Sequence, residues 1–136
     1  MSTTTHHELK APTLSIAEVA DRFGISTDTL RYYEKAGLIA AVGRSSGNHR
    51  RYATADLAWI EFLLRLRDTG MPIAGMQRFA TLRAQGDATI EQRLALLRDH
   101  RTALEQHIER LRRHAETLDA KITHYQDVLA AAQEQR

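Results

Sequence analysis

Apolar side chains recur along most of this chain at intervals of three and four residues, which is the spacing of amphipathic helices. Glycines follow these stretches at four places, and glycine commonly ends a helix because it adopts a positive φ without steric cost. The four are Gly24, Gly37, Gly70 and Gly86. The pattern predicts helices at 15–23, 27–36, 54–69, 72–85 and 89–131.

Residues that favour helix starts stand at the other ends of these segments. Ser15 and Glu18 have the spacing of a capping box, in which each side chain bonds the other residue's backbone N–H. Ser26 and Thr54 are placed to cap the next two helices, and Pro72 suits the first turn of a fourth. The sequence therefore marks both ends of most predicted helices.

Only Gly24-Ile25-Ser26 separates the first two predicted helices, which is the spacing of a helix-turn-helix. Residues 40–52 follow, rich in glycine, serine and asparagine, and they predict a non-helical stretch. Its flanks, 39–42 and 49–52, could pair as a small β-hairpin. A hairpin in this position would be the wing of a winged helix-turn-helix.

The last predicted helix carries the strongest periodic signal. From Ile90 to Leu129 apolar residues alternate in steps of four and three, and only Arg101 interrupts them. Such a repeat predicts a coiled coil with a second copy of the chain, and the alternative is a helix that folds back on its own chain. The predicted dimerisation residues are Leu94, Leu97, Leu104, Ile108, Leu111, Leu118, Ile122 and Tyr125.

Length and composition agree with a small folded domain plus an extension. The 136 residues are 43% hydrophobic and 26% charged, with a net charge of +2. The chain has no cysteine, so it has neither a disulfide framework nor a cysteine nucleophile. With no apolar run of membrane-spanning length and no signal-peptide pattern at the N-terminus, we expect a cytoplasmic protein.

We therefore expect an all-α fold with a small β-hairpin wing and a long dimerisation helix. The expected organisation is a disordered leader at 1–12, a winged helix-turn-helix domain with two supporting helices at 13–86, a coiled coil at 87–131 and a tail at 132–136.

Positive charge is concentrated between residues 31 and 52, where five basic residues face Glu34 alone. Such a cluster is often only a solvated surface. Here it falls on the second helix of the helix-turn-helix and on the predicted hairpin, the elements that contact DNA in such folds. The five basic residues are Arg31, Lys35, Arg44, Arg50 and Arg51.

The run from Thr29 to Ile39, TLRYYEKAGLI, resembles the recognition helix of the MerR family of transcription regulators. The resemblance continues from Arg44 to Tyr52, in the family's wing pattern, and through Asp56-Leu57 to the coiled coil. It covers residues 14 to about 130 and implies a DNA-binding regulator of the short form, without a separate effector-binding domain.

By this resemblance, Arg31 and Tyr33 contact DNA from the recognition helix while Tyr32 packs at the helix–wing junction. Arg44, His49 and Arg50 hold the phosphate backbone, although His49 replaces the usual tyrosine. The full set of predicted DNA-binding residues is Thr27, Asp28, Arg31, Tyr33, Lys35, Arg44, His49, Arg50 and Arg51.

Asp28 lies near the start of the recognition helix and has two possible roles. An acidic side chain there stabilises the helix start, or it accepts a hydrogen bond from a cytosine amino group. The general effect on the helix is the favoured interpretation.

The resemblance further implies a homodimer on a pseudo-palindromic promoter site, where it bends and untwists an over-long spacer so that RNA polymerase engages both elements. The alternatives are a simple repressor or accessory DNA-binding dimer without a small-molecule effector, and a coiled-coil adaptor for an acidic partner. Activation and repression both stay open.

No enzymatic motif, cofactor site or metal site is predicted. The chain lacks a phosphate-binding glycine loop and a nucleophile motif, and Trp59, Phe62 and Phe79 have, with nearby leucines, the spacing of a helical core. His100, His107 and His114 recur every seven residues. They are interpreted as a polar flank of the coiled coil, with a metal- or proton-sensitive stripe as the alternative.

Overall fold

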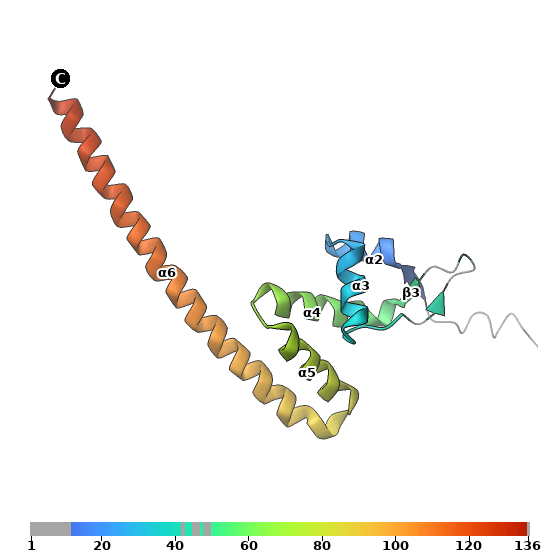
Figure 1. The fold of residues 1–136 in the computed structure, drawn as a ribbon. Coiled ribbons are helices and arrows are strands. Elements are labelled where there is room, and N and C mark those ends of the chain that lie inside the picture. The colour runs from blue at the N-terminus through green and yellow to red at the C-terminus, as the bar shows by residue number, and fades with distance from the viewer. Residues whose placement is uncertain (1–11, 42, 45–46, 48–49, 136) are drawn as a thin grey trace, which may run out of the picture. The chain divides into compact units, whose positions relative to one another are not determined.

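The computed structural model describes residues 12–41, 43–44, 47 and 50–135 (Figure 1). The described chain is helical apart from one small sheet. Its elements are β1 (Thr13–Ser15), α2 (Ile16–Phe23), α3 (Thr27–Lys35), β2 (Gly43–Arg44), β3 (Arg50–Ala53), the 3₁₀ turn η1 (Thr54–Asp56), α4 (Leu57–Asp68), α5 (Ile73–Ala84), the 3₁₀ turn η2 (Asp87–Thr89) and α6 (Ile90–Glu134).

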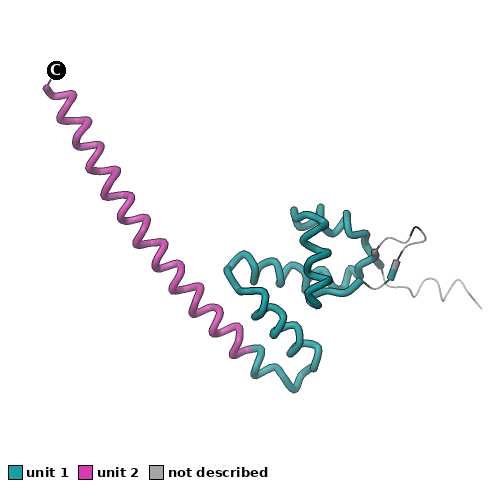
Figure 2. The backbone as a smooth tube through the Cα atoms, in the orientation of Figure 1, with its two compact units in different colours: residues 1–93 teal, residues 94–136 magenta. Residues whose placement is uncertain are grey.

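The chain divides into two compact units, residues 1–93 and 94–136 (Figure 2). The first unit holds the helix-turn-helix, the sheet, α4 and α5, and the second is formed by α6 alone. The predicted fold class, a winged helix-turn-helix followed by one long helix, is confirmed. The leader predicted at 1–12 lies outside the described residues except for Pro12.

The predicted capping box at the start of α2 is present. The Ser15 hydroxyl accepts from the Glu18 backbone N–H at 3.1 Å, and a Glu18 carboxylate oxygen accepts from the Ser15 N–H at 2.9 Å. Gly24 ends the helix with a φ of 65°, and the other three predicted helix-ending glycines also have positive φ. Both ends of α2 are therefore satisfied by local sequence, as predicted.

The turn into α3 is closed by a second cap. Ile25 donates its backbone N–H to the Ala20 carbonyl, and the Ser26 hydroxyl accepts from the Thr29 N–H at 3.1 Å. The expected cap at Thr54 is wrong. Thr54 instead begins the turn η1, and Asp56 precedes α4 without a side-chain cap bond.

A three-stranded antiparallel sheet with the order β1-β3-β2 contains the wing. The predicted hairpin is confirmed, but its first strand is Gly43–Arg44 rather than 39–42. The third strand, β1, was not predicted, because three residues are too few to show an alternating pattern. It pairs with β3 through Leu14 opposite Tyr52.

The core of the first unit joins the helix-turn-helix to the wing and to α4 and α5. Val19, Leu30, Tyr52, Ile60 and Leu63 are almost completely buried. The aromatic residues on α4 and α5 also pack together, as predicted from their spacing: the Trp59 and Phe79 rings stack with centroids 5.9 Å apart. The core therefore holds the recognition helix on its inner face.

Two polar bonds attach the end of α3 and the segment after it to the helices behind. The Trp59 indole N–H donates to the Leu38 carbonyl at 2.8 Å, and the Gln77 amide donates to the Ala36 carbonyl at 3.0 Å. The position of the recognition helix thus depends on hydrogen bonds as well as on packing.

In the second unit α6 has no covering element of its own. The helix contains 45 residues, about 68 Å at the usual rise per residue. Six of the eight predicted dimerisation residues are exposed, and Leu97 and Leu104 are half-buried. Within the described residues no helix is both long and apolar enough to span a bilayer.

We predict that Ser15→Ala lowers the free energy of unfolding by about 1 kcal/mol, because the backbone N–H of Glu18 loses its acceptor, the Ser15 hydroxyl. Urea denaturation followed by circular dichroism measures the change. Ser15→Thr keeps the acceptor and is the matched control. Equal stability of Ser15→Ala and the wild type would contradict the role of the capping box.

We also predict that the contribution of Glu18, the other residue of the capping box, to the free energy of unfolding depends on pH. Its bond from the Ser15 backbone N–H lowers the pKa of the Glu18 carboxyl below its ordinary value. This stabilisation is present above the ordinary pKa and is lost as the pH falls through the lowered one. The unfolding curves of the wild type and Glu18→Ala should converge in acid, and a gap that persists at pH 2 would argue against it.

Candidate nucleic-acid interface

The recognition helix α3 presents most of its predicted DNA-binding residues to solvent. Asp28, Arg31 and Lys35 are exposed, and Thr27 is half-buried. They occupy successive turns of one short helix that begins at the Ser26 cap. The helix therefore offers hydroxyl, carboxylate and cationic groups on its outer face.

Arg31 is held by two neighbours on the same helix. One guanidinium nitrogen, Nη1, donates to the Thr27 hydroxyl at 3.1 Å and to an Asp28 carboxylate oxygen at 2.8 Å. The sequence placed all three residues on one helix, but it did not indicate this bond between Asp28 and Arg31. Asp28 does lie in the first turn, as both of its predicted roles require.

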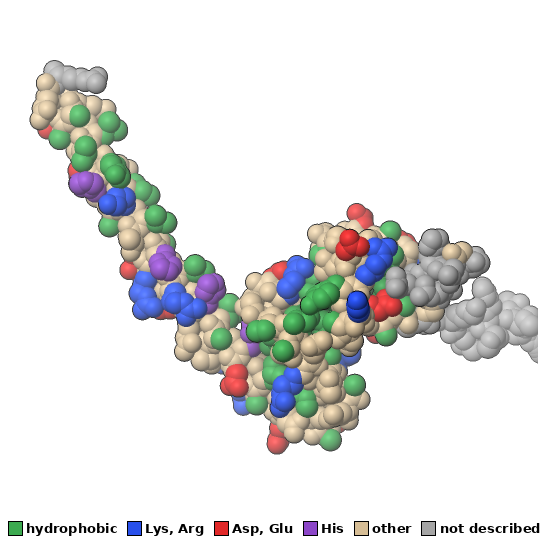
Figure 3. Space-filling model, in the orientation of Figure 1, with side chains coloured by type: hydrophobic (Ala, Val, Ile, Leu, Met, Phe, Trp, Pro, Cys, Tyr) green, Lys and Arg blue, Asp and Glu red, His purple; other side chains and the backbone are tan. Residues whose placement is uncertain are grey.

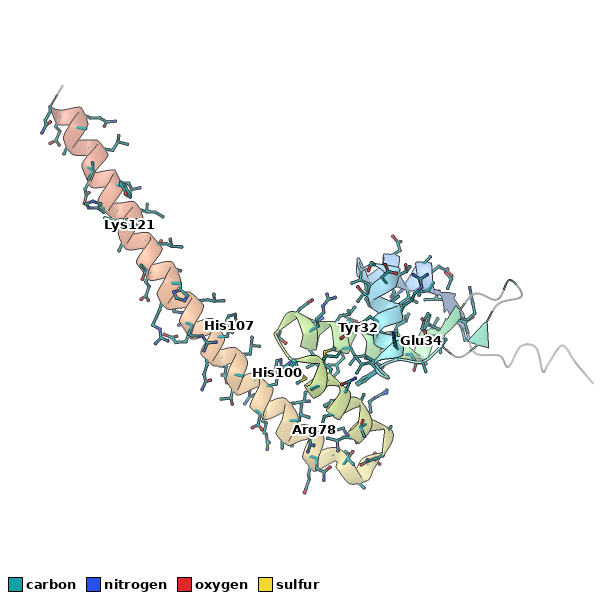
Figure 4. The ribbon with its side chains drawn as sticks, viewed as in Figure 1. Tyr32, Glu34, Arg78, His100, His107 and Lys121 are labelled. Carbon is teal, nitrogen blue, oxygen red and sulfur yellow. The ribbon has the colours of Figure 1, made fainter. Side chains whose placement is uncertain are left out.

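The two tyrosines of α3 differ from expectation in their burial. The predicted packing of Tyr32 is wrong, because its side chain is 54% exposed, whereas Tyr33 is only 3% exposed. The DNA contact assigned to Tyr33 stays a prediction. Tyr32 is the accessible aromatic residue that sequence reasoning missed; it lies on α3 in Figure 4.

Tyr33 lies at the wall of a shallow cleft of about 440 Å³ between α3 and α5. Its hydroxyl is buried and has no hydrogen-bond partner among the described residues. Burial raises the pKa of Tyr33 above its ordinary value, and the positive charge of nearby Arg67 opposes this shift. The Tyr33 ring therefore packs the recognition helix against α5 and the segment before it, because Met76 and Met71 line the same cleft.

The hairpin register places Arg44 directly opposite Arg50. Two cationic residues therefore occupy one ladder pair of the wing. Their predicted neighbour in the interface, His49, lies outside the described residues.

Arg51 has its hydrogen bonds inside the sheet. Its guanidinium donates to the Thr13 hydroxyl at 3.1 Å and to the Thr13 carbonyl at 3.0 Å, and it approaches the Glu18 carboxylate at 3.8 Å. The side chain is 29% exposed. These bonds connect β1 to β3. Arg51 lies in the same basic cluster as the other predicted DNA-binding arginines, so the sequence alone did not reveal this structural role.

Tyr52 connects the wing to the recognition helix. Its hydroxyl donates to a Glu34 carboxylate oxygen at 2.8 Å, and its ring is completely buried. Glu34 had entered the sequence argument only as the one acidic residue in a basic cluster. The structure shows that it fixes the geometry between the two predicted DNA-binding elements.

The heptad histidines lie along α6, where Figure 4 labels two of them. His107 is 3.4 Å from an Arg110 guanidinium nitrogen. In the described part of the chain, no three His, Asp or Glu side chains come close enough together to hold a metal ion. The interpretation of the histidines as a polar flank of a coiled coil stays a prediction, and the sensing stripe stays its alternative.

Two family models match the chain over both its head and its long helix. The model for the MerR family regulatory protein matches residues 15–52, which contain the helix-turn-helix and the wing. The model described as MerR, DNA binding, matches residues 57–121.

Relatives with similar sequences and structures agree with these matches. An uncharacterized HTH-type transcriptional regulator of Haemophilus influenzae is 38% identical over 118 residues, which are 87% of each chain. The solved structure of HiNmlR, a MerR family regulator lacking the sensor domain and bound to promoter DNA, is also 38% identical, with a TM-score of 0.77, and covers 88% of this chain and 94% of its own.

A structure of a MerR family transcriptional regulator from Listeria monocytogenes has a TM-score of 0.80 at 35% identity, covering 90% of this chain and 92% of its own. Two family models and these relatives therefore point to the same class of non-enzymatic protein. The chain belongs to the MerR family of DNA-binding transcription regulators.

Proposed function

We propose that two copies of this chain bind a pseudo-palindromic promoter site and control transcription by distorting an over-long spacer. The observation that carries the proposal is the combination of a recognition helix with exposed cationic residues and a long helix whose apolar stripe has no partner among the described residues of its own unit. Two fixed recognition helices suit two symmetric half-sites.

The dimer is argued from α6. Leu111, Leu118, Ile122 and Tyr125 are each more than half exposed, and apolar side chains recur along the surface of the helix in Figure 3. The stripe continues to Leu129. A shallow groove of about 340 Å³ on this part of the helix is lined by Leu118, Lys121, Ile122, Tyr125, Gln126 and Leu129. A seven-residue apolar repeat of this length is buried by a second helix of the same kind.

The proposed contacts with DNA lie in the first unit, on α3 and the wing. We assign the phosphate contacts to Arg44 and Arg50, because two cationic residues are backbone ladder partners in the wing and phosphate contact is electrostatic. Lys35 and the accessible Tyr32 are further candidates on α3. HiNmlR, a relative that lacks a sensor domain, is bound to promoter DNA in its solved structure, which supports this use of the fold.

Distortion of the spacer is the step that would distinguish an activator from a simple repressor. Bending a site of 20–30 base pairs costs about 1–6 kcal/mol, and contacts at both half-sites must supply this energy. RNA polymerase is then the third partner, at the promoter in the cytoplasm. The competing candidate is a repressor or accessory DNA-binding dimer without an effector.

Transcription in vitro from a promoter whose spacer contains an inverted repeat bound by this protein separates these functions. The proposed activator raises transcription from a promoter with an over-long spacer and lowers it from one with the spacer shortened by two base pairs. Equal repression of both templates would identify the simple repressor instead.

We predict that Arg50→Ala weakens binding to every duplex by a similar factor and makes it less sensitive to salt. Each lost phosphate contact lowers the slope of log affinity against log salt by about 1, so a dimer loses about 2. Fluorescence anisotropy from 50 to 300 mM KCl measures the slope.

Arg51→Ala is the matched control, because this arginine bonds Thr13 within the sheet. It should lower the free energy of unfolding by about 1–3 kcal/mol and leave the salt slope of the folded protein unchanged. A smaller slope for Arg51→Ala, together with an unchanged slope for Arg50→Ala, would reverse the two assignments.

We predict that Leu118→Glu converts the dimer to monomers, because it places a charge in each copy of the buried stripe. Removing a buried leucine costs about 2–5 kcal/mol in each of the two copies, so the dissociation constant rises by at least about a hundredfold. Sedimentation equilibrium measures it, and Asp119→Ala, off the stripe, is the control. A wild-type monomer at micromolar concentration would rule out the proposed dimer.

A further inference from the structure

We infer that Asp28 is a specificity-determining residue, which holds Arg31 so that the arginine recognises guanine in the major groove. The inference rests on the proposed function, since it concerns how the same interface selects its sequence. It assigns Asp28 a role different from both of those that the sequence suggested.

Some of the hydrogen-bond donors of Arg31 are engaged within the helix and others are free within the described part of the chain. A guanidinium has five N–H groups, two of them on Nη1. Both Nη1 bonds are accounted for, one to the Thr27 hydroxyl at 3.1 Å and one to Asp28 at 2.8 Å. The only remaining pair of parallel N–H groups is on Nε and Nη2, and neither nitrogen has a partner among the described residues.

That free pair matches one base edge in duplex DNA. Guanine presents two acceptors, O6 and N7, side by side in the major groove, and a bidentate arginine is their usual partner. Arg31 lies one turn into the recognition helix, and its side chain is 49% exposed. The bonds of Nη1 therefore orient the free Nε and Nη2 groups of Arg31 before DNA binds.

Charge favours a base over a phosphate as the ligand. The Asp28 side chain is 90% exposed, so its negative charge faces the same solvent that DNA would replace. A phosphate at Arg31 would meet this carboxylate as well, and the two repel each other. A guanine edge carries no net charge and loses little from the neighbouring acid, whereas it gains both hydrogen bonds.

Asp28 therefore acts as a positioning residue. It restrains a side chain that otherwise has many rotamers, so less entropy is lost when the base is bound. By repelling phosphate it also disfavours non-specific binding. Removing the carboxylate should consequently lower affinity for the specific site and raise affinity for unrelated DNA.

A selection experiment with the full chain tests this inference. The wild type is first used to select duplexes from a library with a randomised 24-base-pair centre. Anisotropy titrations then measure the affinity for the selected duplex and for a scrambled duplex. They also measure it for variants of the selected duplex in which a guanine is replaced, in both half-sites, by each of the other three bases. The relevant G is the position whose preference Arg31→Lys abolishes.

The wild type should prefer guanine there by roughly 5- to 150-fold, the range of one good bidentate pair. Asp28→Ala should lose at least four-fifths of that preference and bind the scrambled duplex more tightly. Asp28→Asn keeps an acceptor without the charge, so it should retain most of the preference while also binding the scrambled duplex more tightly.

Glu61→Ala is the matched control, because it removes a similar exposed pair, with Arg65 at 3.2 Å on α4. It should leave the base preference unchanged, and thermal melts verify that each variant is folded. A merely structural role for Asp28 would change the melts without changing the ratio between bases.

Two results overturn the inference while leaving the proposed function intact: an unchanged guanine preference in Asp28→Ala, or an Arg31→Lys loss that is equal for all four bases, as expected of a phosphate contact. A wild type that enriches no sequence from the library would instead refute the proposed function, and the inference with it.

Discussion

The bond between Tyr52 and Glu34 joins the recognition helix to the wing, the two elements that we propose contact DNA. The tyrosine comes from the middle of the sheet and the glutamate from the exposed helix α3, and their oxygens lie 2.8 Å apart. The tyrosine ring is buried beneath, so packing holds the hydroxyl in place. A hydrogen bond to a charged acceptor in such a setting is among the stronger ones in proteins. The angle between the recognition helix and the wing is thereby set by a contact within a single chain.

The sequence predicted the helices well because their signals are local. Ser15 and Glu18 specify one end of α2 and Gly24 the other, and no distant residue is needed to recognise them. The strand β1 and the bonds of Arg51 were not predictable in this way, since Thr13 and Arg51 are 38 residues apart in the chain. Their pairing arises only when the sheet forms.

The interface shows the same division between local and tertiary information. The residues of α3 that face outward could be chosen by helical spacing, but Tyr32 and Tyr33 are adjacent, and only packing against the scaffold decides which of them is buried. Arginines were equally ambiguous. Arg31 and Arg51 look alike in a basic cluster, yet one is restrained by its own helix at the surface and the other fastens a strand.

The exposed stripe of α6 has a consequence for how the protein persists in a cell. Most of the stability of a helix in a protein comes from packing of its apolar face, and α6 has no covering layer among the described residues of its own unit. In the proposed dimer, ordering of the last third of the chain is therefore linked to mass action. The concentration of chains in the cell then sets the fraction of dimer. At low concentration more chains have an unpaired α6 that proteases can cleave, and at high concentration dimerisation protects the helix.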